Sequence, residues 1–216
     1  KETFTIDKQG NITTSDGSEV ELREVLSDSY DSDVTVRQDF LEYEILIPMD
    51  GHNGVSLRNL VNTFYSKQHL IKKAFGIEKD IISNRFVEGV NNVSAETLED
   101  FQGVLQQVGE GENQGIKFDF KDKNIRVNFL EGQPDSDKIR AYTQLMGLLS
   151  EYAKTIKYAS TKVKPTDNDK YAFRVFLLRI GMIGDEYKTA RKVLLENLNG
   201  HGSFRNGKKP EQKEGE

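Results

Sequence analysis

The spacing of apolar residues changes along this chain, and that change limits the fold more than any other feature. In Ile116–Phe129 apolar residues occupy every second position of two runs, IKFDF and IRVNF, which the residues KDKN separate. This alternation predicts a β-hairpin with one buried face. In Ser56–Gly76 apolar residues recur at every third or fourth position, which predicts an amphipathic helix. A chain that keeps the two spacings in separate segments is expected to adopt an α+β fold.

Similar patterns locate the other expected elements. Phe4–Asp7 and Ile12–Thr14 are expected to form a second hairpin, with Gly10 and Asn11 in its turn. Runs rich in β-branched and aromatic residues predict strands at Val34–Val36 and Phe40–Ile47. Helices are expected at Val20–Leu26, Asp80–Val90, Ser94–Val108, from Asp135 or Ser136 to Ser160, at Asp169–Ile180 and at Gly184–Leu198.

Individual residues are predicted to delimit three of these elements. Ser56 is the expected N-cap of the helix that ends near Gly76, because its hydroxyl can accept a backbone N–H. Gly76 is expected to stop that helix in a left-handed conformation. Pro48 is expected to end the strand before it, and Pro165 is expected to interrupt the helical C-terminal part.

The chain is expected to divide into three parts. The run EGQPDSD separates an α+β region, residues 1–132, from a helical module, residues 133–207. Residues 208–216 are too polar to order themselves and are expected to form a disordered tail. The helical module is expected to form a small bundle that packs on the apolar face of the Ser56–Gly76 helix, because that face needs a partner.

Composition removes several kinds of site. Among 216 residues there is no Cys, which excludes disulfides and thiolate ligands or nucleophiles. The three His residues lack metal-ligand spacing, and a Mg²⁺ or Ca²⁺ site built from carboxylates alone stays an alternative. No metal site and no cofactor are assigned. The nucleotide-binding patterns GxGxxG and GxxxxGK[ST] and the hydrolase pattern GxSxG are absent. No set of residues is therefore assigned to catalysis, and an enzyme with an unrecognised carboxylate site stays an alternative.

Membrane and export signals are also missing from the sequence. No apolar run approaches the ~20 residues of a transmembrane helix, so no membrane partner is expected. The first residues, KETFTIDKQGN, lack the apolar segment of a signal peptide. The first residue is Lys rather than Met, which leaves open whether residues precede it.

Charge is distributed unevenly along the chain. Residues 1–50 contain 13 acidic and 4 basic residues, whereas residues 151–216 contain 9 acidic and 14 basic residues. The two ends could complement each other, bind different partners, or form ordinary solvated surface. The candidate acidic surface contains Asp28, Asp31, Asp33 and Asp39.

The expected C-terminal helix pair carries a set of cations. Two such helices could neutralise phosphates, and their order loosely resembles a helix-turn-helix. The same cations could instead meet water or form structural ion pairs, since Glu186 and Glu196 interleave with them. The candidate residues for binding nucleic acid or a protein partner are Arg174, Arg179, Lys188, Arg191, Lys192, His201 and Arg205.

Two blocks of the chain resemble a known family. SLRNLVNTFYSKQHLIKKAFG (Ser56–Gly76) and DKYAFRVFLLRIGMIGDEYKTARKVLLENLNGHGSFRNG (Asp169–Gly207) are similar to parts of proteins labelled "virulence-related protein". Mobile genetic elements and plasmids of Gram-positive bacteria encode these proteins. The second block is the more specific, and the first fifty residues show no such resemblance. The resemblance implies a cytoplasmic accessory protein with a C-terminal helical module, and it carries over no catalytic residue.

Three functions follow as hypotheses. The first is a non-enzymatic binding protein, with a protein partner, that serves maintenance or transfer of the element or its interaction with the host. The second is a nucleic-acid-binding protein that uses the basic C-terminal helices. The third is a host-defence antagonist that presents its acidic N-terminal surface as a decoy.

Overall fold

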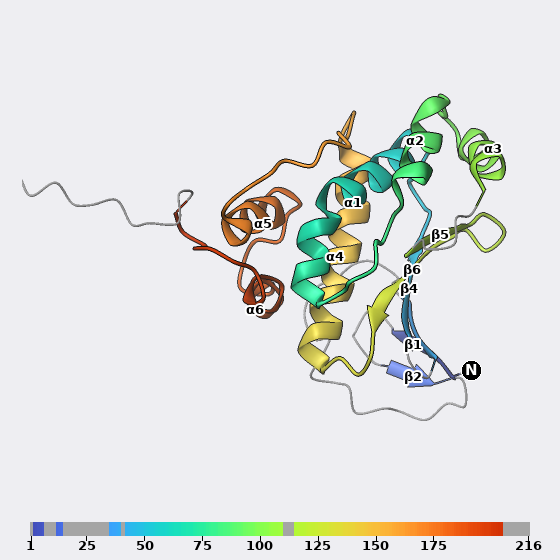
Figure 1. Cartoon of the computed structure of the whole chain (residues 1–216). Helices are drawn as coiled ribbons and strands as arrows, with labels where there is room; N and C mark the ends of the chain where they lie inside the picture. The colour runs from blue at the N-terminus through green and yellow to red at the C-terminus, as the bar shows by residue number, and fades with distance from the viewer. Residues whose placement is uncertain (1, 7–11, 15–34, 40–41, 110–114, 205–216) are drawn as a thin grey trace, which may run out of the picture.

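The computed structural model describes residues 2–6, 12–14, 35–39, 42–109 and 115–204, and these residues form an α+β fold (Figure 1). This confirms the predicted fold class. The elements in chain order are β1 (Glu2–Ile6), β2 (Ile12–Thr14), β3 (Thr35–Asp39), β4 (Glu42–Pro48), α1 (Gly54–Phe75), α2 (Asn84–Asn92), α3 (Leu98–Val108), β5 (Ile116–Asp119), β6 (Asn124–Glu131), α4 (Ser136–Thr155), α5 (Asp169–Arg179) and α6 (Lys188–Glu196). The helix expected at Val20–Leu26 lies outside the described residues.

The described strands form one antiparallel sheet in the order β2-β1-β3-β4-β6-β5. Both predicted hairpins are confirmed, because β1 pairs with β2 and β5 pairs with β6. Alternation along β6 buries Ile125, Val127 and Phe129, as expected. Strand β5 ends at Asp119, one residue earlier than predicted, because that side chain accepts the backbone N–H groups of Lys121 and Asp122 in the turn.

Helix α1 begins earlier than predicted. Its N-cap is Asn53, whose side chain accepts the N–H of Ser56 at 2.9 Å, while the Ser56 hydroxyl accepts the N–H of Asn53 at 2.8 Å. Ser56 is therefore the third helical residue of a capping box, and its assignment as N-cap was wrong. Gly76 ends the helix with φ 73°, which confirms the predicted stop.

The next two helices, in contrast, begin later than expected, because contacts with α1 hold the preceding segments in non-helical conformations. Gln68 of α1 accepts the N–H groups of Ile81 and Ile82 and donates to the Ile82 carbonyl, so α2 starts at Asn84 rather than Asp80. The carbonyl of Glu96 accepts the N–H of Gly54, and α3 starts at Leu98 rather than Ser94.

The C-terminal helices are shorter than predicted. Helix α4 starts at Ser136, as expected, with Asp135 as its N-cap, but it ends at Thr155 rather than Ser160, because Asn59 binds the backbone beyond it. Helix α5 ends at Arg179. Helix α6 starts at Lys188 rather than Gly184, after a turn that contains two glycines with positive φ.

Asn168 ties the residues after α6 to the start of α5. Its side chain accepts the N–H groups of Tyr171 and His201, and it donates to the carbonyls of His201 and Phe204. Gly200 passes this amide with φ 101°, and a Cβ there would overlap the Asn168 side chain. The amide thus joins two segments more than thirty residues apart.

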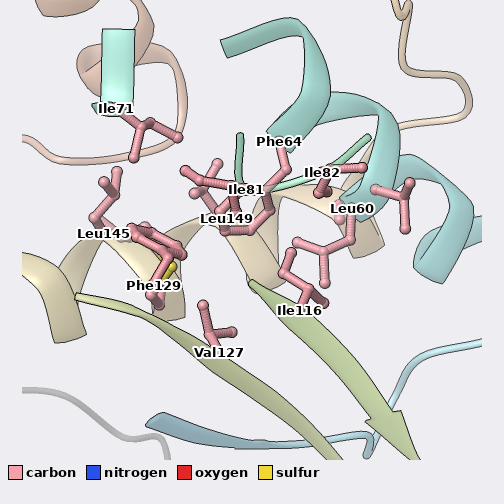
Figure 2. Close-up of a cluster of buried hydrophobic side chains, with 14 of the residues drawn as sticks. Leu60, Phe64, Ile71, Ile81, Ile82, Ile116, Val127, Phe129, Leu145 and Leu149 are labelled. Carbon is pink, nitrogen blue, oxygen red and sulfur yellow. The ribbon is translucent and has the colours of Figure 1, made fainter. Parts of the chain in front are cut away.

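One buried cluster contains side chains from the sheet and from all six described helices. Figure 2 shows the part of it where α1 and α4 meet β5 and β6. Its centre is an edge-to-face group of Phe64, Phe75, Phe129 and Tyr142, in which Phe129 and Tyr142 lie 4.9 Å apart between ring centroids. Burial raises the pKa of the Tyr142 hydroxyl. Helices α1 and α4 pack side by side between the sheet and the α5–α6 pair (Figure 1), so residues from both sides of the predicted boundary at 132 share this core.

Candidate functional site

The basic residues singled out in the sequence lie in different surroundings. Arg191 donates to the carbonyls of Met182 and Gly184 at 3.0 and 2.8 Å, and so holds the turn between α5 and α6. Arg174 reaches the Gly202 carbonyl at 3.4 Å. The exposed His201 ring lies 5.0 Å from Phe204, between ring centroids. The structure therefore gives several of these side chains neighbours within the protein.

The other predicted residues divide into exposed ones and ones outside the described chain. Lys188 and Lys192 are exposed on α6, and Arg179 is exposed at the end of α5. Asp39 ends β3, where its backbone pairs with Glu42. The structure does not describe the remaining predicted site residues, Arg205, Asp28, Asp31 and Asp33.

Of the predicted basic residues, Arg179 lines a cleft in the described part of the chain. This cleft has a volume of about 490 Å³ and lies between α1, α5 and the segment 156–166 that follows α4. Its basic lining residues are Lys67, His69, Lys162, Lys164 and Arg179, and its aromatic ones are Tyr152, Tyr158, Tyr171 and Phe176. We name it the α1–α5 cleft.

Two asparagines of α1 hold the wall of the cleft in place. Asn59 donates to the Ile156 carbonyl at 2.7 Å and accepts the Ala159 N–H at 3.0 Å. Asn62 donates to the Ala159 carbonyl at 3.2 Å and exchanges hydrogen bonds with the side chain of Asn91. The backbone on both sides of Tyr158 is therefore fixed to a buried helix.

Positive charge in the cleft is not balanced by its own lining. Four Lys and Arg side chains line it, and the lining contains neither Asp nor Glu. Burial, followed by the charges of Arg179 and Lys164, lowers the pKa of Lys67. The Lys67 ammonium also lies 5.5 Å from the centre of the Phe176 ring. A half-buried cation, Lys67, thus lies near two exposed ones, Lys164 and Arg179.

His69 also lines the cleft, beside these cations. Its Nδ1 atom is buried and has no hydrogen-bond partner within the described protein. Burial lowers the pKa of His69, Asp169 opposes that shift, and Lys67 and Lys73 add to it. Asp169 is itself paired with Lys73 at 2.6 Å, so this nearby carboxylate already has a cationic partner.

A second hollow, of about 640 Å³, lies beside β5 and α3, and its lining mixes two acidic residues with three basic ones. Arg126 pairs there with Asp119 and lies within 3.9 Å of Glu44 and 3.8 Å of Asp122. Hydrogen bonds from the Asp122 backbone and from Arg126 lower the pKa of Asp119. A surface that already neutralises its own charges gives an anionic ligand little electrostatic gain.

A His–Ser arrangement also occurs, but it is buried. The ring nitrogens of His52 share hydrogen bonds with the hydroxyls of Ser56 at 2.9 Å and Ser150 at 2.8 Å. His52 is 7 % exposed and Ser150 is 1 % exposed. Burial, and then the charge of Lys154, lowers the pKa of His52 to about 4, so the ring is neutral near pH 7. A substrate has no access to these hydroxyls, and the group serves as a polar link between the start of α1 and α4.

Sequence reasoning missed most of the cleft, although one signal was present. The chain between Glu151 and Asp167 contains four Lys residues, two Tyr residues and no acid. That run faces Lys67 across the cleft, and only the fold brings the two together.

Comparisons with protein-family models, with curated proteins and with solved structures found no match. In the described part of the chain, no group of three or more His, Asp or Glu side chains is placed to hold a metal ion. None of the helices described there is long and apolar enough to cross a bilayer. The resemblance to virulence-related proteins therefore stays a prediction.

Proposed function

We propose that this protein binds nucleic acid through the α1–α5 cleft. The observation that carries the proposal is the gathering of Lys67, Lys162, Lys164 and Arg179 around one cavity whose lining contains no carboxylate. Cations that neutralise phosphates release condensed counterions, which drives binding of nucleic acid without regard to sequence. A concave site with low-dielectric walls also concentrates its positive field.

The chemistry of the lining favours nucleic acid over a simple anion. The same cavity presents three Tyr side chains beside the cations. Aromatic rings and cations in one groove are the combination that binds bases and backbone together. The chain as a whole has a net charge of −5, so a positive cleft is a local departure from its general charge.

The test is fluorescence anisotropy with a labelled mixed-sequence oligonucleotide, single-stranded and annealed, over a series of salt concentrations. The double variant Lys164→Ala/Arg179→Ala removes two exposed cleft cations, and Lys117→Ala/Lys121→Ala removes two exposed cations from the β5 hairpin. We expect binding to weaken only in the cleft variant. The slope of log K against log salt should flatten by about 0.7 per lost contact on single strands and about 0.9 on duplex.

Two results would overturn the proposal. One is absence of binding by the unchanged protein at low salt. The other is equal weakening by the cleft variant and the β5 variant, which would indicate general charge rather than a site. A third variant, Lys188→Ala/Lys192→Ala, tests the exposed face of α6. If only this variant loses affinity, nucleic acid binds at the basic helix α6, as the second hypothesis from the sequence predicts, and not in the cleft.

The proposed setting is maintenance or transfer of a mobile genetic element, in the cytoplasm and with a protein partner. Its support is the resemblance of Ser56–Gly76 and Asp169–Gly207 to virulence-related proteins. Pull-down of the tagged protein from its host, with and without nuclease, tests it. Partners lost after nuclease treatment would indicate bridging by nucleic acid, and partners that remain would indicate direct protein contacts.

A further inference from the structure

The shape of the α1–α5 cleft restricts what form of nucleic acid can enter it. A volume of about 490 Å³ falls in the range of pockets that enclose one small ligand, which is about 300–1,000 Å³. In a duplex the bases are stacked inside and only their edges face the grooves. In a single strand, bases can be splayed out and inserted into a pocket. The cavity is therefore suited to an unpaired nucleotide.

Tyr158 is the second observation. Its side chain is 73 % exposed, the highest exposure among the large hydrophobic side chains of the described residues. Exposed aromatic rings are commonly found on mobile loops, but here Asn59 and Asn62 fix the backbone on both sides of it. A ring on a fixed backbone segment loses less conformational freedom on stacking with a ligand than a ring on a mobile loop does.

The cations and the ring are arranged as parts of one site. Tyr158, Lys162 and Lys164 come from a single segment, which faces Lys67 of α1 and Arg179 of α5. Lys67 lies close enough to Arg179 and Lys164 for both of their charges to lower its pKa, after the larger effect of burial. A phosphate among these three cations would lie in a cavity that Tyr158 also lines.

We infer that the cleft receives an unpaired nucleotide of a single-stranded nucleic acid, with the phosphate near Lys67, Lys164 and Arg179 and the base against Tyr158. The inference rests on the proposed function and adds to it the strand form and the stacking residue. Stacking on aromatic side chains depends little on base identity, so the site recognises single strands rather than a sequence.

The test compares three proteins, unchanged, Tyr158→Ala and Tyr158→Phe, on one oligonucleotide as single strand and as duplex. Tyr158→Phe is the matched control because it keeps the ring and removes only the hydroxyl. We expect the unchanged protein and Tyr158→Phe to bind the single strand at least about tenfold more tightly than the duplex, whereas Tyr158→Ala should lose roughly tenfold on the single strand and nothing on the duplex. A 2-aminopurine base in the oligonucleotide should be quenched by both proteins that have the ring.

The outcomes separate this inference from the proposed function. Equal affinity for single strand and duplex, or full single-strand affinity in Tyr158→Ala, overturns the inference while nucleic-acid binding through the cations stands. Absence of binding to either form overturns both. A nucleoside monophosphate that competes as well as the oligonucleotide would identify a free nucleotide as the ligand and also overturn the single-strand inference.

Discussion

Gln68 and Lys67 are neighbours in α1, yet they lie in opposite surroundings. The Gln68 amide is buried and makes three hydrogen bonds, to the N–H groups of Ile81 and Ile82 and to the Ile82 carbonyl. Lys67 faces two further cations in a cavity whose lining has no carboxylate. The first arrangement is what a stable scaffold requires. The second gives Lys67 one ring contact, with Phe176, but no carboxylate partner in the cavity lining, and crowded like charges in a cleft are a reason to expect a ligand.

This comparison separates two kinds of polar residue on one helix. Substitution of residues whose hydrogen-bond partners lie within the protein should lower the free energy of unfolding. Substitution of cleft residues should lower the affinity for nucleic acid. Asn59 and Asn62 connect the two kinds, because they are satisfied scaffold residues that position the cleft wall.

The largest expected effect is loss of the scaffold contact at Gln68. Gln68→Ala would leave three buried backbone groups of Ile81 and Ile82 without their partner, and each unsatisfied group costs about 1–3 kcal/mol. We expect a decrease of about 4 kcal/mol in the free energy of unfolding, measured by urea denaturation. The exposed Gln106→Ala is the control and should change it by less than about 0.5 kcal/mol. An unchanged free energy of unfolding in Gln68→Ala would contradict the assignment of Gln68 to the scaffold.

Acid should weaken the scaffold at His52. Its pKa is about 4 in the folded protein and near 6.5 when unfolded, so the unfolded state binds the proton more readily. This contribution is complete above pH 6.5 and is lost as the pH falls toward 4, by about 3 kcal/mol in total. Urea denaturation between pH 7.5 and 4.5 measures it. His52→Gln does not titrate and should show a flatter dependence, and parallel curves would contradict the assignment.

Asn59→Ala should affect both properties. It removes hydrogen bonds to the Ile156 carbonyl and the Ala159 N–H, and we expect a loss of about 2 kcal/mol in stability. Because the wall that carries Tyr158 is then less fixed, oligonucleotide affinity should fall about threefold in protein that is still folded. Thermal unfolding and anisotropy measure the two effects, with the exposed Asn92→Ala as control. Unchanged affinity in folded Asn59→Ala would show that the wall does not need this anchor.

The smallest effect on stability is expected inside the cleft. Lys67→Met keeps most of the length of the side chain and removes a charge that faces Lys164 and Arg179. We expect the free energy of unfolding to stay the same or to rise by no more than about 0.5 kcal/mol, while oligonucleotide affinity falls. Lys117→Met on the exposed β5 hairpin should change neither. A clear loss of stability in Lys67→Met would place this lysine among the scaffold residues.

The sequence predicted the fold class, both hairpins and most helices, because periodicity and caps such as Gly76 and Asp135 act locally. It misplaced the start of α1, where the local capping box of Asn53 and Ser56 was not recognised. It also misplaced the start of α2 and the end of α4, where tertiary hydrogen bonds from Gln68 and Asn59 compete with helix formation. Among the predicted cations it included Arg179 but neither Lys67 nor Lys164. Those two residues lie almost a hundred positions apart, and only folding reveals that they share a cavity.

The tie between Asn168 and Gly200 has a consequence for evolution. The Asn168 amide fills the space that a Cβ at position 200 would need, so a side chain at position 200 and the present rotamer of Asn168 exclude each other. A lineage that lost either residue would be expected to change the other soon afterwards. Joint inheritance of the two residues would therefore be a simple criterion for deciding which other sequences close their C-terminal segment in the same way.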